Sequence, residues 1–191
     1  MRVMMVVVAA AAAFGLAAAP AMAAPALSEQ TVFYDISGST MKDLVDELRR
    51  KGPLDADGKR YDADTRWTVK WNYRYQPKGD ACRLNTVHVS AEIKYVMPRL
   101  ADSARVPADL RQRWNSYIGN LKTHENGHGR HGSDAAREVE KALLALSRAN
   151  YTGITADADT TAKQVIAKYN KLDIDYDAKT SHGATQGALF R

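Results

Sequence analysis

The alternation of apolar and polar residues in the middle of the chain predicts two long β-strands. A period of two runs from Trp67 to Tyr75 and again from Val87 to Met97, as is typical of strands with one buried face. The expected buried faces consist of Trp67, Val69, Trp71, Tyr73 and Tyr75, and of Val87, Val89, Ala91, Ile93, Tyr95 and Met97. We favour a core face over a carbohydrate or peptide platform for the aromatic stripe. The strands should pair antiparallel across a turn near Gly79.

Apolar residues at helical spacing predict helices on both sides of these strands. After a short strand over 31–37, Thr40 can cap a helix that Gly52-Pro53 ends. A second helical pattern begins after Pro107, continues into residues 124–128 and resumes at Ala135. A short helix is expected over 156–169, and residues 171–191 have the composition of turns.

The first residues predict a signal peptide over 1–23. Arg2 precedes an apolar, alanine-rich run, and the run ends at a small-residue site, Ala21-Met22-Ala23. Residues 24–191 are then long enough for a single domain. Strands before helices predict an α+β fold, with a small antiparallel sheet packed on one long helix. We expect a secreted or periplasmic protein with no stable membrane insertion after cleavage.

Charge and cysteine content narrow the function classes. Lys and Arg exceed Asp and Glu by 27 − 22 = +5, and the basic residues are scattered rather than clustered with aromatics. Nucleic-acid binding therefore has no support in the sequence. Cys82 is the single cysteine, so an intramolecular disulfide is excluded, and core packing is its expected role rather than nucleophilic catalysis.

The strongest chemical signal is the run His124-Glu125-Asn126-Gly127-His128. Residues four apart share a helix face, so His124 and His128 can bind one metal ion. Glu125 is placed beside a metal-bound water, where it can act as general base. Zinc is the expected ion because it accepts neutral imidazoles and keeps a position open for water. Gly127, Gly129 and Gly132 each cost about 1 kcal/mol in a helix interior. Glycines at these positions can instead let a strand or a substrate approach closely.

A hydrolytic zinc site needs a third protein ligand, and the sequence leaves several open. His182 is our first choice, since it lies on a downstream segment that could fold back over the histidines. His131 lies about 10.5 Å along a helix from His124, which favours a supporting role. Asp134 has the spacing of the last metzincin ligand, and Glu138 imitates the gluzincin glutamate. Either would need a break in the helix near Gly132.

Taken together, these motifs resemble a bacterial family of uncharacterised domains described as predicted secreted zinc-dependent proteases. The resemblance rests on Gly38, Gly52-Pro53, the Trp67-x-Val69-x-Trp71-x-Tyr73 strand, Cys82-x-Leu84, Trp114, His124-Glu125-x-Gly127-His128, Tyr176-Asp177, Thr180 and His182-Gly183. It implies a zincin-like domain with His124 and His128 as ligands and Glu125 as base. It also strengthens His182 as a ligand and gives Tyr176 and Asp177 a part in orienting ligands or stabilising the oxyanion. Asp177 and Tyr176 thereby join Asp134 and His131 as alternative ligands or supporting residues.

The sequence therefore predicts a zinc metallopeptidase that hydrolyses a peptide or protein substrate in the cell envelope. An amidase acting on peptidoglycan peptides would use the same chemistry. A non-catalytic zinc-binding or adaptor protein is the competing hypothesis from a different class, because ligands can be retained for folding alone.

Overall fold

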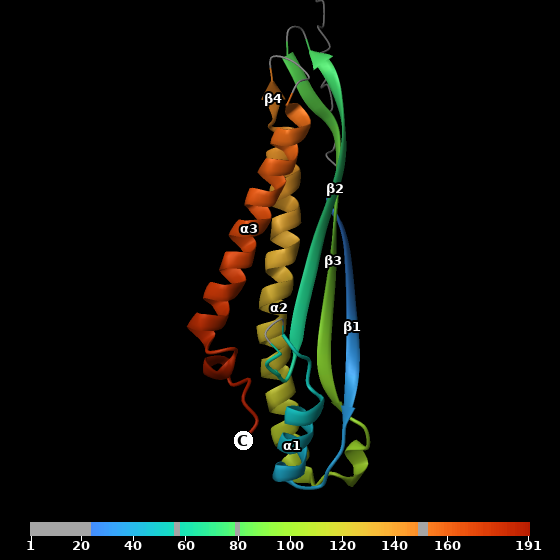
Figure 1. Cartoon of the computed structure of the whole chain (residues 1–191). Helices are drawn as coiled ribbons and strands as arrows, with labels where there is room; N and C mark the ends of the chain where they lie inside the picture. Colours follow the sequence, from blue (N-terminus) through green and yellow to red (C-terminus); the bar gives the residue numbers. More distant parts are fainter. Residues whose placement is uncertain (1–23, 56–57, 79–80, 149–152) are drawn as a thin grey trace, which may run out of the picture.

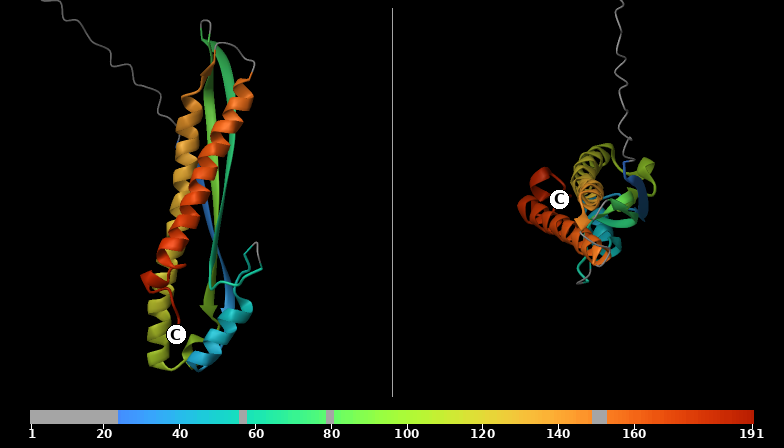
Figure 2. Two further views of the ribbon diagram at one scale, coloured as in Figure 1. Left: turned by 60° about the vertical axis from the view of Figure 1, so that its left-hand side comes forward. Right: turned by 90° about the horizontal axis from the view of Figure 1, so that it is seen from above.

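A small sheet and two long helices form an elongated α+β structure in the computed structural model of the chain (Figure 1). The structure describes residues 24–55, 58–78, 81–148 and 153–191, so the expected signal peptide and the turn at Gly79 lie outside the described residues. Helices α2 (Ala108–Leu144) and α3 (Ile154–Thr180) lie on the same side of the sheet (Figure 2). Among the described residues, no helix has the length and apolarity needed to cross a bilayer.

The sheet has the strand order β1-β3-β2, and the short strand β4 pairs with β3. The strands are β1 (Ala26–Ile36), β2 (Asp64–Lys78), β3 (Ala81–Leu100) and β4 (Ser147–Arg148). β2 and β3 pair antiparallel, with Trp67 opposite Ile93, which confirms the predicted pairing. β1 begins earlier than expected and pairs parallel with β3, so the sheet is mixed rather than purely antiparallel. A parallel partner is possible because α1 (Met41–Lys51) and β2 intervene between β1 and β3.

The face of the sheet toward the long helices carries the core that the alternation predicted. All six apolar positions from Val87 to Met97 are buried, and Cys82 is a buried free thiol in the same core. Trp67, Trp71 and Tyr73 pack against this core, as expected for a core face. Tyr75 departs from the pattern because the register shifts between Arg74 and Tyr75, and half of its surface is exposed.

Helix α1 begins and ends where its capping residues predict. The Thr40 hydroxyl accepts a hydrogen bond from the Asp43 N–H, and the Asp43 carboxylate accepts one from the Thr40 N–H. This reciprocal pair satisfies backbone donors at the helix start. The helix buries Leu44 and Leu48, and Gly52 follows its last residue.

Helix α2 is continuous through the histidine run, despite its three glycines. Each of these glycines lies against an aromatic ring, with Tyr176 at Gly127, Tyr95 at Gly129 and Trp67 at Gly132. A Cβ atom at Gly132 would lie 2.6 Å from Trp67 Cγ, so the glycine allows the indole to pack on the helix backbone. Close approach by other elements thus explains why these residues are glycine.

Helix α3 is longer than the sequence predicted. It continues to Thr180, so the expectation of turns from position 171 is wrong as far as Thr180. Beyond it, Ser181 and His182 have left-handed backbone conformations and lead into the 3-10 helix η2 (Ala184–Gln186). The chain end returns to the core, where Phe190 packs against Trp114 and Tyr117.

Two glycines of α2 provide a matched test of this packing. Gly132→Ala should lower the free energy of unfolding by about 1–3 kcal/mol, because its methyl group would collide with the Trp67 indole. Gly119→Ala should raise it by up to about 1 kcal/mol, since a Cβ there meets nothing within 4 Å and alanine favours helix. Denaturant unfolding measures both changes, and equal effects would contradict this close packing of Trp67 on α2.

Candidate metal and catalytic site

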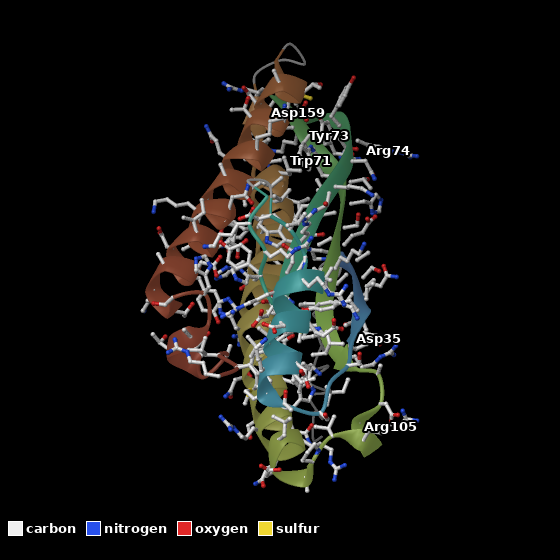
Figure 3. The ribbon with its side chains drawn as sticks, turned by 60° about the horizontal axis from the view of Figure 1, so that its bottom comes forward. Asp35, Trp71, Tyr73, Arg74, Arg105 and Asp159 are labelled. Atoms are coloured by element: carbon white, nitrogen blue, oxygen red, sulfur yellow. The ribbon has the colours of Figure 1, made fainter. Side chains whose placement is uncertain are left out.

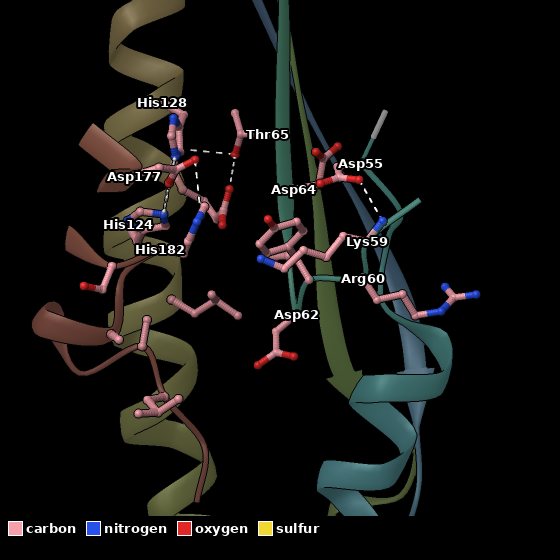
Figure 4. Close-up of a pocket in the computed structure, with 18 of the residues that line it drawn as sticks. Asp55, Lys59, Arg60, Asp62, Asp64, Thr65, His124, His128, Asp177 and His182 are labelled. Atoms are coloured by element: carbon pink, nitrogen blue, oxygen red, sulfur yellow. Dashed lines mark hydrogen bonds and ion pairs between the residues drawn. The ribbon is translucent and has the colours of Figure 1, made fainter. Parts of the chain in front are cut away.

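Two pairs of side chains, each four residues apart on a helix, face one another between α2 and α3. His124 and His128 lie on α2, and Asp173 and Asp177 lie on α3. Residues at this spacing share a helix face, so each helix presents its pair toward the other. Figure 4 shows Asp177 lying against His124 and His128.

Three of these residues bring one donor atom each to a compact triangle. Asp177 Oδ1 lies 3.1 Å from His124 Nε2 and 3.2 Å from His128 Nε2, and the two Nε2 atoms are 3.3 Å apart. Donor atoms around a tetrahedral zinc ion at its usual bond lengths are separated by about 3.3 Å. The triangle therefore fits three ligands of such an ion, with a fourth position left for water. The donor set also suits other divalent transition metals, so the geometry identifies a possible metal site rather than the ion.

Asp173 lies beside this triangle in a different arrangement. Its Oδ1 is 2.8 Å from His128 Nδ1 and 2.7 Å from His131 Nδ1, while its Oδ2 accepts a hydrogen bond of 2.7 Å from Trp67 Nε1. These separations are those of hydrogen bonds to a carboxylate and are too short for ligands sharing an ion. Although His128, His131 and Asp173 lie close enough together to count as a possible metal group, we interpret Asp173 as a hydrogen-bond acceptor.

The other histidine is oriented by the C-terminal segment. His124 Nδ1 lies 2.9 Å from Gln186 Oε1, and the Tyr176 ring stacks on the His124 imidazole at 5.0 Å. The segment can approach this closely because Gly183 adopts a φ of +79° and a Cβ there would lie 2.9 Å from His124 Cγ. Both imidazoles thus have Nδ1 engaged in a hydrogen bond and Nε2 directed at the triangle, the arrangement that fixes metal-ligating histidines.

Glu125 lies next to the triangle with its carboxylate held by strand β2. Glu125 Oε2 accepts a hydrogen bond of 2.6 Å from Thr65 Oγ1. Both residues line a cleft of about 450 Å³ that also contains the three donor residues. The cleft runs between the segment before β2 and the two long helices, and its outer wall includes Lys59, Arg60, Tyr61, Asp62, His182 and Leu189.

Burial and neighbouring charges shift the pKa values of the site in a consistent way. Burial raises the pKa of Glu125, only partly opposed by the hydrogen bond from Thr65 and by the two imidazoles. Burial lowers the pKa of His128, but hydrogen bonds with Asp173 and Asp177 outweigh it and raise this pKa to about 10. Burial likewise opposes ionisation of Asp177, yet its contacts with His124 and His128 lower its pKa overall. Without a metal, a proton on His128 therefore compensates the carboxylates.

His182, our first choice for the third ligand, is outside both groups of possible metal ligands found among the described residues. Its Nδ1 lies 3.5 Å from Asp177 Oδ2, and half of its side chain is exposed. The left-handed turn at Ser181 and His182 carries the imidazole to the cleft mouth, where its ring is 5.1 Å from that of Tyr61. The donor atom that completes the triangle belongs to Asp177, which the sequence had left as an alternative ligand or a supporting residue.

Asp134 and Glu138 pair with residues outside the site. Asp134 is exposed and pairs with Arg137, and Glu138 pairs with Lys168. Neither reaches the triangle, because the break in α2 that they required is absent from the described helix. His131 Nδ1 lies 2.7 Å from Asp173 Oδ1 and, like Asp173, it stands beside the triangle rather than in it.

The sequence reasoning missed Asp173, Gln186, Thr65 and Trp67. A signal for Asp173 was present, because Asp173 and Asp177 repeat the four-residue spacing of the two histidines. The turn-like composition of residues 171–191 concealed it, because a four-residue spacing brings side chains together only on a helix. Thr65, Trp67 and Gln186 had no local signal, since only the folded chain brings them to the helix.

The fold and the site define an α+β protein with a buried histidine–aspartate cluster and an adjacent glutamate in a cleft. Residues 31–183 match the model of a bacterial protein family of unknown function, DUF922, and the chain belongs to this family. Searches of curated proteins and of solved structures give no significant match.

The raised pKa of His128 predicts a pH-dependent contribution to stability in metal-free protein. Because this pKa rises from 6.5 to about 10 on folding, the contribution is complete below pH 6.5 and is lost as pH increases toward 10. In the presence of a chelator, the unfolding free energy of wild type should therefore exceed that of His128→Gln, and the difference should be largest at pH 6. The difference should shrink by an amount on the order of a few kcal/mol by pH 10. If the stability difference between wild type and His128→Gln does not change with pH, the pKa of His128 is not raised by folding.

Proposed function

We propose that this protein is a zinc-dependent peptidase of zincin type, exported to the cell envelope or secreted. The observation that carries the proposal is the triangle of His124 Nε2, His128 Nε2 and Asp177 Oδ1, with Glu125 beside it in the cleft. Two neutral imidazoles and one carboxylate form a ligand set found in catalytic zinc sites. The signal-like residues 1–23 support export.

The chain's own residues would divide the reaction between them. Zinc held by the three donors would supply a Lewis acid that polarises the scissile carbonyl and lowers the pKa of water to about 7. Glu125 takes the proton that the attacking water gives up as the new C–O bond forms. It then passes this proton to the amide nitrogen as the C–N bond breaks. The raised pKa of Glu125 suits a group that must both accept and return a proton.

The surroundings of Glu125 support the role of base over that of ligand. Its Oε2 is engaged by Thr65, and Glu125 is in neither group of possible metal ligands among the described residues. Asp177 instead supplies the carboxylate of the triangle, with its side chain about one third exposed toward the cleft.

Replacing the proposed base separates catalysis from metal binding. Glu125→Gln should lower kcat by about 10²–10⁴-fold while zinc stoichiometry stays near that of wild type, because the amide cannot accept the proton. Peptide-library hydrolysis and elemental analysis measure the two quantities. Glu140→Gln, a buried glutamate elsewhere on α2, is the matched control and should keep wild-type turnover.

The same comparison can reject the proposal. A Glu125→Gln protein with undiminished function in cells and bound zinc would indicate a zinc-binding adaptor. If wild-type protein purified without added metal contains no near-stoichiometric transition metal, both the peptidase and the zinc-binding adaptor are excluded. An amidase acting on peptidoglycan peptides would be recognised by turnover of those peptides and none of protein substrates.

The third ligand is tested by comparing Asp177 with His182, which both line the cleft. Asp177→Ala should weaken zinc binding by about 10-fold or more, since it removes one corner of the triangle. His182→Ala should bind zinc with nearly wild-type affinity, because its half-exposed imidazole lies 3.5 Å from Asp177 Oδ2, longer than a normal hydrogen bond. Competition with a chromophoric chelator gives both affinities. The reverse order would restore His182 as the ligand.

A further inference from the structure

We infer that strand β2 positions the proposed base and one proposed ligand through two residues of the same strand face, Thr65 and Trp67. The inference rests on the proposed function for the role of Glu125, but the contacts of both residues are independent of it. Residues two apart on a strand point to the same side, here toward α2 and α3.

Thr65 acts on Glu125. Its hydroxyl carries a single proton and lies 2.6 Å from Glu125 Oε2 and 3.4 Å from the Glu125 carbonyl oxygen, so the carboxylate is the preferred acceptor. A donor at this distance fixes one carboxylate oxygen and leaves the other to accept a proton. It also favours the charged form that burial disfavours.

Trp67 acts on His128 through Asp173. The indole donates from Nε1 to Asp173 Oδ2, while Asp173 Oδ1 faces His128 Nδ1 and His131 Nδ1. A proton held on His128 Nδ1 toward this carboxylate leaves the Nε2 lone pair available to a metal ion. Asp173 is thus fixed from two sides, by a strand and by the histidine helix.

The strand can perform this task because it is rigid and lies very close to α2. Thr65 and Trp67 pair with Tyr95 and Ile93 of the long strand β3, which holds the backbone of β2. Gly132 provides the space for the indole, because any larger residue would push Trp67 and its hydrogen bond away from Asp173. Strand β2 therefore fixes the positions of the proposed base and of one proposed ligand relative to each other.

The chain offers a matched control for Trp67. Trp71 lies on the same face of β2, and its Nε1 donates to Asp159 of α3 at 3.3 Å. Figure 3 shows Trp71 and Asp159 together near the end of the molecule where α3 begins. Neither residue lines the cleft, so Trp71→Phe removes an equivalent hydrogen bond without reaching the site.

The experiment measures zinc affinity and steady-state kinetics of Trp67→Phe, Trp71→Phe, Thr65→Val and Thr65→Ser in the full mature chain. Trp67→Phe should weaken zinc binding by about 10-fold or more, whereas Trp71→Phe should leave it unchanged. Thr65→Val should retain zinc and KM but lose about 10–100-fold in kcat, and Thr65→Ser should recover most of it, because serine keeps the hydroxyl.

Equal zinc affinities of Trp67→Phe and Trp71→Phe would overturn the role of Trp67, and wild-type kcat in Thr65→Val would overturn that of Thr65. Thermal unfolding identifies any variant that has lost its fold. If Thr65→Val is unfolded, Thr65→Ser replaces it as the diagnostic variant, and a partial loss of kcat is expected. If wild type binds zinc but cleaves no peptide, the proposed function fails. In that case the zinc affinities still support or overturn the role of Trp67. A double-mutant cycle of unfolding free energies for Thr65 and Glu125 then tests whether these two side chains interact.

Discussion

The approach of two carboxylates on α3 to two imidazoles on α2 is the interaction on which the site depends. Asp177 meets the Nε2 atoms of His124 and His128, and Asp173 meets His128 from its opposite ring nitrogen. Groups of this kind are costly to bury alone and tolerable when paired. The pairing therefore adds a polar contact to the apolar packing of α3 on α2 and, without a metal, keeps a proton on His128. A metal ion would take over that compensating charge.

The contact between α2 and α3 requires that the surrounding elements come unusually close to the backbone of α2. Gly127, Gly129 and Gly132 admit the rings of Tyr176, Tyr95 and Trp67. Each would disfavour an isolated helix, yet α2 remains continuous because packing on the sheet and on α3 stabilises it. Gly127 and Gly132 are thus part of the site's construction, because Tyr176 packs on His124 and Trp67 reaches Asp173.

Membership of a family of unknown function gives the site a context but no substrate. The cleft walls combine Lys59 and Arg60 with Asp62 and Asp64, so charge alone favours no substrate class. The donor set restricts the possible reactions more than the fold does, because an α+β architecture is compatible with many activities. Any activity therefore depends on the triangle, on Glu125 and on the residues that hold them in place.

Features that depend on neighbours along the chain could be predicted from the order of the amino acids. Period-two alternation gave the buried faces of β2 and β3, and the four-residue spacing placed His124 and His128 on one helix face. The tertiary structure alone decided the third corner of the triangle. Apolar residues alternate with polar ones along 171–180 instead of recurring at helical spacing: Leu172, Ile174, Tyr176 and Ala178. The helical form of this stretch therefore depends on packing rather than on an amphipathic pattern. Only that helix brings Asp177 to the histidines and leaves His182 at the cleft mouth, because the distance between residues some fifty positions apart is fixed by the fold and not by their spacing.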